Sequence, residues 1–380
     1  MTAEGRGSTV SHDTARPRRA TRPLFVTRKF PPSVGGMQTL AAGVWKALER
    51  GAPGARLIAH GGSNRMLPAW LLGALPRVAA ATGGQKVDCA LTGDALMYSL
   101  CRPIFLARHV PNATMIMGLD VTYPNRLYRM IVHPALRRAP LVIAISQATA
   151  EAAVAIGVRR ERVAVVRLGI PPPSVHHGSR QHAAEDLRRQ LGIRADQVIL
   201  LTVGRLVRRK GVTWFVRHVL PHLPSSVTYL VAGEGPMADE VVRLVAELGL
   251  GDQVRLLGAV DEDDRERLLL GADMFVQPNI PVPGDMEGFG LVLLEAAMRG
   301  TTTVASGIDG IVDAVVDGRT GFLVPPGDAQ AWTERISALV SSPSELPEIG
   351  ARFQQASRAL FSEEQMSQAL LGLLSGGISA

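Results

Sequence analysis

Residues 198–220, VILLTVGRLVRRKGVTWFVRHVL, contain an apolar strand, a basic loop and an amphipathic helix in one short stretch. We predict the strand at 198–203 and the helix at 212–220 from their hydrophobic patterns. The same order of elements returns along the second half of the chain. Further strands are predicted at 228–232, 254–256, 274–277 and 302–305, and further helices at 237–247, 263–270 and 291–299. Such alternation indicates a parallel sheet covered by helices.

The first half of the chain repeats this pattern. Strands are predicted at 23–27, 57–60, 87–91, 113–117, 141–145 and 163–167, and helices at 37–50, 67–81 and 147–156, the last one capped by Ser146. Residues 169–181, GIPPPSVHHGSRQ, have the composition of an interdomain linker. The chain is therefore predicted to be an α/β protein with two doubly wound parallel sheets. In such folds ligands bind beyond the carboxyl ends of the strands, which places the active site in the cleft between the two domains.

The expected domain boundaries follow from these elements. Residues 1–22 form a disordered basic tail, 23–175 the first domain, 176–355 the second domain, and 356–380 a helix that packs back toward the first domain. A hydrophobic content of 46% excludes disorder for most of the chain. No apolar run reaches the roughly 20 residues that a membrane span requires, and the tail lacks the apolar core of a secretory signal.

Charge is distributed unevenly between the halves. Residues 1–175 hold 23 Lys and Arg against 8 Asp and Glu, a net +15, whereas the remainder holds 18 against 26, a net −8. A basic first half suggests an anionic partner such as a nucleic acid, a membrane surface or an acidic substrate. A merely solvated arginine-rich surface is the alternative. A nucleic acid is disfavoured because the chain has only four Trp and four Tyr and no recognition motif.

The densest group of candidate site residues is MEGFGLVLLE, residues 286–295. Glu287 precedes a Gly288-Phe289-Gly290 turn that opens a helix, and backbone N–H groups at a helix N-terminus form a phosphate site. Glu295 lies further along this helix, where a carboxylate can bind the vicinal hydroxyls of a ribose.

The second group is VGRLVRRKG, residues 203–211. Arg205 and Lys210 follow a buried strand and precede a helix, so both can project into the cleft. Fixed cations at this place suit a diphosphate whose negative charge grows as it leaves. Arg208 and Arg209 are interpreted as solvated side chains of the same loop.

Other features carry less information. Gly35-Gly36 lies between a strand and a helix and allows close approach of a ligand, although a plain tight turn is the more frequent explanation of such a pair. The acidic run 261–264 is interpreted as the N-terminal charge of a helix rather than a metal site. His176 and His177 lie in the linker as solvated residues. Arg126, Arg129, Arg137 and Arg138 accompany apolar residues on one helix, typical of either a solvated face or a surface that meets an anionic membrane.

Taken in order, six motifs carry a family resemblance. They are FPPSVGGM (30–37), MGLDVTYPN (117–125), VGRLVRRKG (203–211), AGEGP (232–236), EGFGLVLLE (287–295) and GRTGFLVPPGD (318–328). Over about residues 23–375 the chain resembles the glycosyltransferases of family four, which have the GT-B architecture of two facing Rossmann-like domains. Members of this family are retaining, metal-independent enzymes that use nucleotide-diphosphate sugars.

The resemblance implies a role for each matching residue. Glu287 would contact hydroxyls of the donor sugar and Glu295 the nucleotide ribose, while Arg205 and Lys210 would neutralise the diphosphate. Main-chain groups of Gly288, Phe289, Gly290 and Leu291 would contact the donor, and Gly35 and Gly36 would lie near the diphosphate and acceptor. Many relatives carry His where this chain has Met117, which leaves Asp120 as the titratable group of that motif and a candidate catalytic residue.

The function implied is transfer of a sugar from a nucleotide-diphosphate sugar, with UDP or GDP as the expected nucleotide. The acceptor is a hydroxyl of a lipid-linked, polysaccharide or small-metabolite compound, in bacterial cell-envelope or natural-product biosynthesis. No metal or cofactor is expected, and the protein is expected to be cytoplasmic, with peripheral contact to the inner face of the membrane left open. A relative that binds sugar nucleotides or sugar phosphates without efficient transfer is the alternative, because of Met117.

Overall fold

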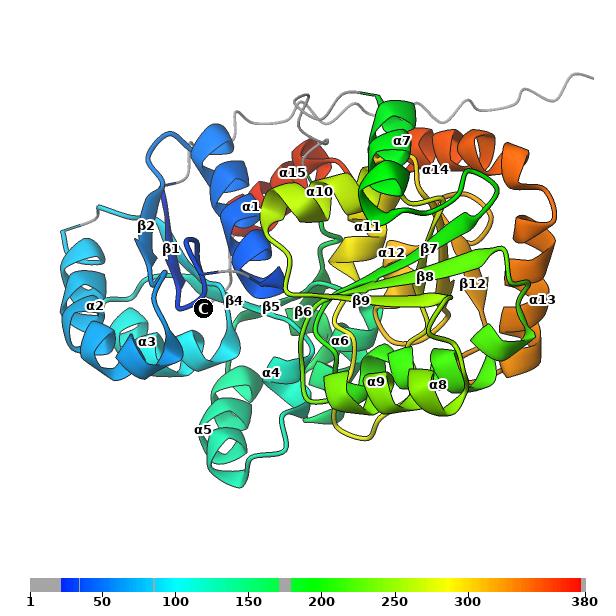
Figure 1. Ribbon diagram of the computed structural model, residues 1–380. Coiled ribbons are helices and arrows are strands. Elements are labelled where there is room, and N and C mark those ends of the chain that lie inside the picture. Colours follow the sequence, from blue (N-terminus) through cyan, green and yellow to red (C-terminus); the bar gives the residue numbers. More distant parts are fainter. Residues whose placement is uncertain (1–21, 34, 85, 171–178, 377–380) are drawn as a thin grey trace, which may run out of the picture.

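The computed structural model describes residues 22–33, 35–84, 86–170 and 179–376, and forms two six-stranded parallel sheets side by side with helices packed around them (Figure 1). The expected fold class, an α/β protein with two facing doubly wound domains, is confirmed. The tail predicted at 1–22 lies outside the described residues except for Arg22, as do His176 and His177.

The first sheet has the strand order β2-β1-β3-β4-β5-β6. Its strands are β1 (Pro23–Thr27), β2 (Arg56–Ala59), β3 (Cys89–Thr92), β4 (Asn112–Ile116), β5 (Leu141–Ala144) and β6 (Val163–Val165). Its helices are α1 (Gly36–Gly51), α2 (Leu67–Ala81), α3 (Ala95–Ala107), α4 (Leu119–Thr122), α5 (Arg126–Arg137) and α6 (Gln147–Ala155). The strand order reverses between β1 and β3, the kind of place at which ligands bind in folds of this type.

The second sheet has the order β12-β11-β10-β7-β8-β9. Its strands are β7 (Val198–Val203), β8 (Val227–Ala232), β9 (Val254–Gly258), β10 (Met274–Gln277), β11 (Thr302–Ser306) and β12 (Phe322–Val324). The helices are α7 (Arg180–Leu191), α8 (Val212–His218), α9 (Ala238–Glu247), α10 (Glu262–Gly271), α11 (Leu291–Met298), α12 (Ile311–Ala314), α13 (Ala329–Val340), α14 (Leu346–Leu360) and α15 (Glu363–Ser375). Here the order reverses between β7 and β10.

Buried runs explain the strands, and capping residues explain where helices begin. All six residues of β7 are buried, as expected for a central strand covered on both faces. Ser146 caps α6 by accepting a hydrogen bond from the Thr149 N–H, as predicted. Asp261, at the start of the acidic run, caps α10 in the same way by accepting from the Asp264 N–H.

The linker predicted at 169–181 extends two residues too far toward the C-terminus. Residues 180 and 181 form the first turn of α7, because Ser179 accepts the His182 N–H and starts the helix there. Residues 95–107, for which no element is predicted, form α3. Asp94 caps this helix, and its interior contains Pro103.

The end of the chain returns to the first sheet. Helix α15 packs against α1, where Arg50 and Glu363 form an ion pair at 2.9 Å and the Ser367 hydroxyl donates to the Ala47 carbonyl at 3.0 Å. The boundary expected at residue 356 falls inside α14. No helix among the described residues combines the length and apolar content needed to cross a bilayer.

Candidate active site

The candidate site lies at the carboxyl ends of β7 and β10, where the strand order of the second sheet reverses. The loop after β7 carries Arg205, Arg209 and Lys210, and the loop after β10 carries Asn279 and Glu287. The loops that follow two such neighbouring strands lead toward opposite faces of the sheet, and in folds of this type ligands bind at this point. Arg209 and Glu287, 78 positions apart in sequence, are therefore brought to one place by the topology.

Both halves of the molecule meet at this place. A Cβ added to Gly36 at the start of α1 would lie 3.9 Å from Leu291 at the start of α11. A Cβ on Gly288 would lie 3.1 Å from the carbonyl oxygen of Met117, so Gly288 packs closely against the first half. The Gln147 N–H also donates to Asp313 across the halves at 2.9 Å. Gly36, Gly288 and Leu291, predicted to lie near the donor, thus line the contact between the two sheets.

Glu287 is buried and surrounded by cations. Its carboxylate pairs with Lys210 at 2.6 Å and with Arg209, and accepts a hydrogen bond from the Asn279 amide at 3.1 Å. Burial by itself would raise the pKa of Glu287, but the charges of Lys210 and Arg209, with the hydrogen bonds, lower this pKa to about 2. The carboxylate is therefore ionised at neutral pH and fixed in position as an acceptor of hydrogen bonds.

Lys210 is the cation on the other side of this pair. Its side chain is 11% exposed, and burial lowers its pKa while the charge of Glu287 raises it. An ammonium group has three donors, of which Glu287 occupies one in its ion pair. The remaining donors can serve an anionic ligand.

Arg209 corrects the sequence interpretation. Predicted to be a solvated side chain, it is only 16% exposed and bridges Asp285, at 3.0 Å, and Glu287. Its partners lie in the loop after β10, so nothing local distinguishes it from Arg208, which is exposed as predicted. Arg205 is exposed at the end of β7 and forms no ion pair with the described residues.

The glycine turn is shaped by close packing. Gly290 has φ +86° and caps α11, a conformation that L side chains rarely adopt. Phe289 is buried and packs edge-on against Phe361, with ring centres 6.4 Å apart. Gly35 caps α1 with φ +150°. Each of the two glycine turns predicted to contact the donor therefore begins a helix, α1 or α11. The N-termini of these two helices lie close together, with Gly36 next to Leu291.

Glu295 has a partner that sequence reasoning missed. Arg265 on α10 binds both of its carboxylate oxygens, at 2.6 and 3.4 Å, and also binds Glu262. Burial opposes the charge on Arg265, but the two carboxylates raise its pKa. The sequence signal was an arginine directly after the acidic run that starts α10. No group of three or more His, Cys, Asp or Glu that suits a metal ion is present in the part of the chain that the structure describes.

Residues 183–359 match the family model of glycosyl transferases group 1. The D-inositol 3-phosphate glycosyltransferase of Corynebacterium urealyticum is 34% identical over 199 residues, which cover 48% of this chain and 44% of that protein. The second half of the chain is thus similar to the group 1 glycosyl transferases.

Other relatives agree with this family. The putative colanic acid biosynthesis glycosyltransferase WcaL of Escherichia coli is 26% identical over 268 residues, 69% of this chain and 63% of that protein. Over the first curated relatives, the matched region spans about half of their length. Anabaena HepE in complex with UDP and glucose has a TM-score of 0.74 at 22% identity, over 94% of this chain and all of that chain. This likeness supports the GT-B fold.

The family match covers the Glu287, Lys210 and Glu295 region, whereas Asp120 lies outside it. Asp120 is buried, and its carboxylate accepts the Met117 N–H at 2.9 Å and the Tyr128 hydroxyl at 3.4 Å. Both oxygens are thus engaged in holding the turn after β4. Met117 itself is buried in an apolar cluster with Ile145 and Phe289.

A second carboxylate lies close to Asp120. Asp94 is fully buried and pairs with Arg28 at 2.9 Å. Burial, together with the charge of Asp94, raises the pKa of Asp120 to about 7, although Arg28 and the hydrogen bonds oppose the shift. Arg28, Asp94 and Asp120, from the loops after β1, β3 and β4, therefore form a cluster in which Asp120 changes its protonation near neutral pH.

We predict that Asp120→Asn changes how stability depends on pH. The pKa of Asp120 is higher in the folded chain than in the unfolded chain, so the folded form binds more protons between about pH 4 and 7, and stability falls as pH rises through this range. Asparagine can accept from Met117 and donate to Tyr128 without a charge. Urea unfolding at pH 5 and pH 8 measures the free energy of unfolding of both proteins. Between these two pH values the variant should lose less of this free energy than the unaltered protein. An equal loss in the two proteins would contradict the prediction.

Proposed function

We propose that this protein is a retaining glycosyltransferase that moves a sugar from a nucleotide-diphosphate sugar to an acceptor hydroxyl without a metal ion. The observation that carries the proposal is the buried Glu287, held by Lys210, Arg209 and Asn279 beside the contact between the two halves. In the proposal the second domain binds the donor and the first domain binds the acceptor. UDP or GDP sugars are the expected donors, and the UDP-bound HepE structures support the former.

The chemistry follows from the charges. The bond between C1 of the sugar and the diphosphate oxygen breaks, and the diphosphate leaves with the electron pair. Lys210 and Arg205 would stabilise its growing negative charge, which matters most where water is excluded. The acceptor oxygen bonds to C1 on the face that the diphosphate leaves, and its proton passes to a diphosphate oxygen. Glu287, ionised and fixed, would orient the sugar through its hydroxyls.

The acceptor is proposed to be anionic or lipid-linked, because the first half of the chain is basic. Relatives named for colanic acid and amylovoran biosynthesis and for D-inositol 3-phosphate support an envelope polysaccharide or phosphorylated small acceptor. Cytoplasmic nucleotide sugars would supply the donor. Closing of the cleft on the donor would exclude water and so limit hydrolysis.

A thermal-shift screen with UDP, GDP, ADP and dTDP sugars tests the donor. A ligand that binds only the folded state stabilises it by about 2.7 kcal/mol at 100 times its Kd, so the true donor raises Tm and the others do not. Assays of donor consumption with candidate acceptors then separate transfer from binding alone. Failure of every sugar nucleotide to raise Tm would overturn the proposal.

Glu295→Gln is expected to weaken donor binding about tenfold or more, because hydrogen bonds to a charged group are worth roughly 1.5–3 kcal/mol. Glu262→Gln is the matched control, since Glu262 also binds Arg265 but is 71% exposed. Titration calorimetry with the nucleotide diphosphate measures both. Equal affinities in the two variants would show that Glu295 does not hold the ribose.

A further inference from the structure

Helix α5 has apolar residues on two faces. Val132 and Leu136 are buried in the core that α5 shares with α3. On the outward face, Leu127, Met130 and Ile131 are 67%, 73% and 47% exposed. Their spacing of three and four residues places them side by side on the helix. A helix on the surface of a globular protein ordinarily turns its polar side chains outward, so this outward face is unusual.

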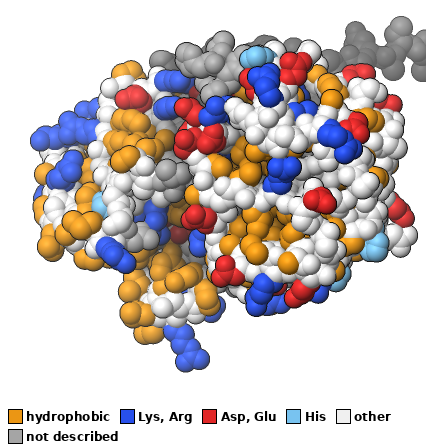
Figure 2. All heavy atoms as spheres, in the orientation of Figure 1, with side chains coloured by type: hydrophobic (Ala, Val, Ile, Leu, Met, Phe, Trp, Pro, Cys, Tyr) orange, Lys and Arg blue, Asp and Glu red, His pale blue; other side chains and the backbone are white. Residues whose placement is uncertain are grey.

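The exposed apolar residues continue onto α4. Leu119 and Tyr123 are 41% and 46% exposed. We call Leu119, Tyr123, Leu127, Met130 and Ile131 the α5 surface. In Figure 1, α5 projects below the first half, and α4 joins it to the body of the molecule. Figure 2 shows hydrophobic side chains gathered over this projection with a basic side chain at its tip. The α5 surface is therefore convex and protruding rather than a groove.

Charge around the α5 surface has one sign. Four exposed arginines accompany it: Arg126, Arg129, Arg137 and Arg138. The single acidic residue among positions 119–138 is Asp120, which is buried. Within the described chain none of these arginines forms an ion pair. Their charges are consequently available to an anionic partner.

We propose that the α5 surface binds the surface of an anionic lipid bilayer. Exposed Leu, Met and Ile side chains on a convex helix fit the boundary between headgroups and acyl chains, and arginines close to the bilayer gain roughly 1 kcal/mol each from anionic lipids. A protein partner would need complementary acidic residues around an apolar hollow, whereas a bilayer supplies apolar depth and phosphate charge along its whole surface. The one-sign charge and the convex shape together favour the bilayer.

The position of the α5 surface gives such binding a consequence. The carbonyl oxygen of Thr122, at the end of α4, lies 3.8 Å from where a Cβ on Gly284 would be, in the loop that leads to Glu287. Docking through α5 would therefore hold the cleft close to the lipid headgroups, where a lipid-linked acceptor resides. This last step rests on the proposed function, whereas bilayer binding itself does not.

Sedimentation of the full chain with vesicles tests the proposal without any donor or acceptor. Vesicles of phosphatidylcholine with phosphatidylglycerol should bind the chain at 50 mM salt, and vesicles of phosphatidylcholine alone should not. Binding should weaken at 500 mM salt because salt screens the attraction. The triple variant Leu127→Ser, Met130→Ser and Ile131→Ser keeps every charge and should bind at least about tenfold more weakly.

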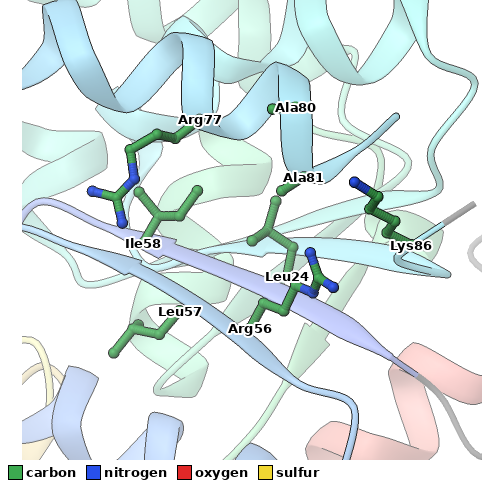
Figure 3. A pocket seen from close by; sticks show the side chains of 8 residues that line it. All are labelled: Leu24, Arg56, Leu57, Ile58, Arg77, Ala80, Ala81 and Lys86. Atoms are coloured by element: carbon green, nitrogen blue, oxygen red, sulfur yellow. The ribbon is translucent and has the colours of Figure 1, made fainter. Parts of the chain in front are cut away.

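Matched controls separate the α5 surface from general properties of the first half. Leu72→Ser alters an apolar residue that is 80% exposed on α2 and should change nothing. A hollow of about 470 Å³ between β2 and α2 carries Arg56, Arg77 and Lys86 (Figure 3), and its lining contains no carboxylate. The hollow variant changes these three residues to alanine. The α5 variant carries Arg126→Ala, Arg129→Ala and Arg138→Ala, so the two variants lose the same amount of positive charge.

The two charge variants should therefore differ. The α5 variant should lose most of its vesicle binding, and the hollow variant should stay within about twofold of the unaltered chain. Equal losses in both, no binding to anionic vesicles at low salt, or dissociation of a dimer by the Leu127, Met130 and Ile131 changes would overturn the proposal. Sugar transfer to a soluble acceptor, measured separately, reports on the proposed function.

Discussion

Lys210→Ala is expected to lower kcat for sugar transfer by at least about 100-fold, the loss typical when one donor to a developing negative charge is removed. Lys210 lies at the reversal of strand order between β7 and β10 and is 11% exposed. In a site so shielded from water, a cation acts strongly on a leaving diphosphate. Steady-state kinetics with the donor identified by thermal shift measures the effect.

The fold should survive this change. Removing one partner of a buried ion pair ordinarily destabilises a protein by about 3–5 kcal/mol because the other charge is left unpaired. Here Glu287 keeps Arg209 and the Asn279 amide, so the loss should be smaller. Arg208→Ala, an exposed residue two positions away, is the control and should keep full activity. A kcat within twofold of the unaltered protein for Lys210→Ala would remove Lys210 from the mechanism.

Gly211→Ala is expected to destabilise the second domain by about 2–5 kcal/mol. Gly211 has φ +67°, which costs an L side chain roughly 1–2 kcal/mol. A Cβ at this position would also overlap the carbonyl oxygen of Pro278, and overpacking adds about 1–3 kcal/mol. Because Pro278 precedes Asn279, any shift that relieves the overlap moves a residue that holds Glu287. The midpoint of urea unfolding and kcat should both fall.

Gly249→Ala separates the two contributions. Gly249 has nearly the same conformation, φ +66°, but no atom lies within 4 Å of an added Cβ. Only the backbone strain should remain, so this variant should lose less than about 2 kcal/mol and keep its activity. Equal destabilisation of the two variants would show that the contact with Pro278 plays no part.

Local patterns were sufficient to predict most of the fold. The apolar run 198–203 became the buried strand β7, and Ser146 and Asp261 began helices, because strand burial and helix capping depend on residues close in sequence. The glycine turn before α11 was predicted for the same reason. Prediction failed at residues 95–107, where Pro103 lies within α3, and at Arg180, where Ser179 starts α7 inside the presumed linker.

What the sequence by itself determined was the alternation of elements, the fold class, and the candidates Glu287, Glu295, Arg205 and Lys210. Only the tertiary structure decided what those residues contact. Arg208 and Arg209 are identical neighbours, yet Arg209 alone meets Asp285 and Glu287 because β7 and β10 are adjacent in the sheet. Arg265 meets Glu295 because α10 packs against α11. Periodicity depends on nearest neighbours along the chain, whereas the charge, burial and exposure of a side chain depend on elements that only folding brings together.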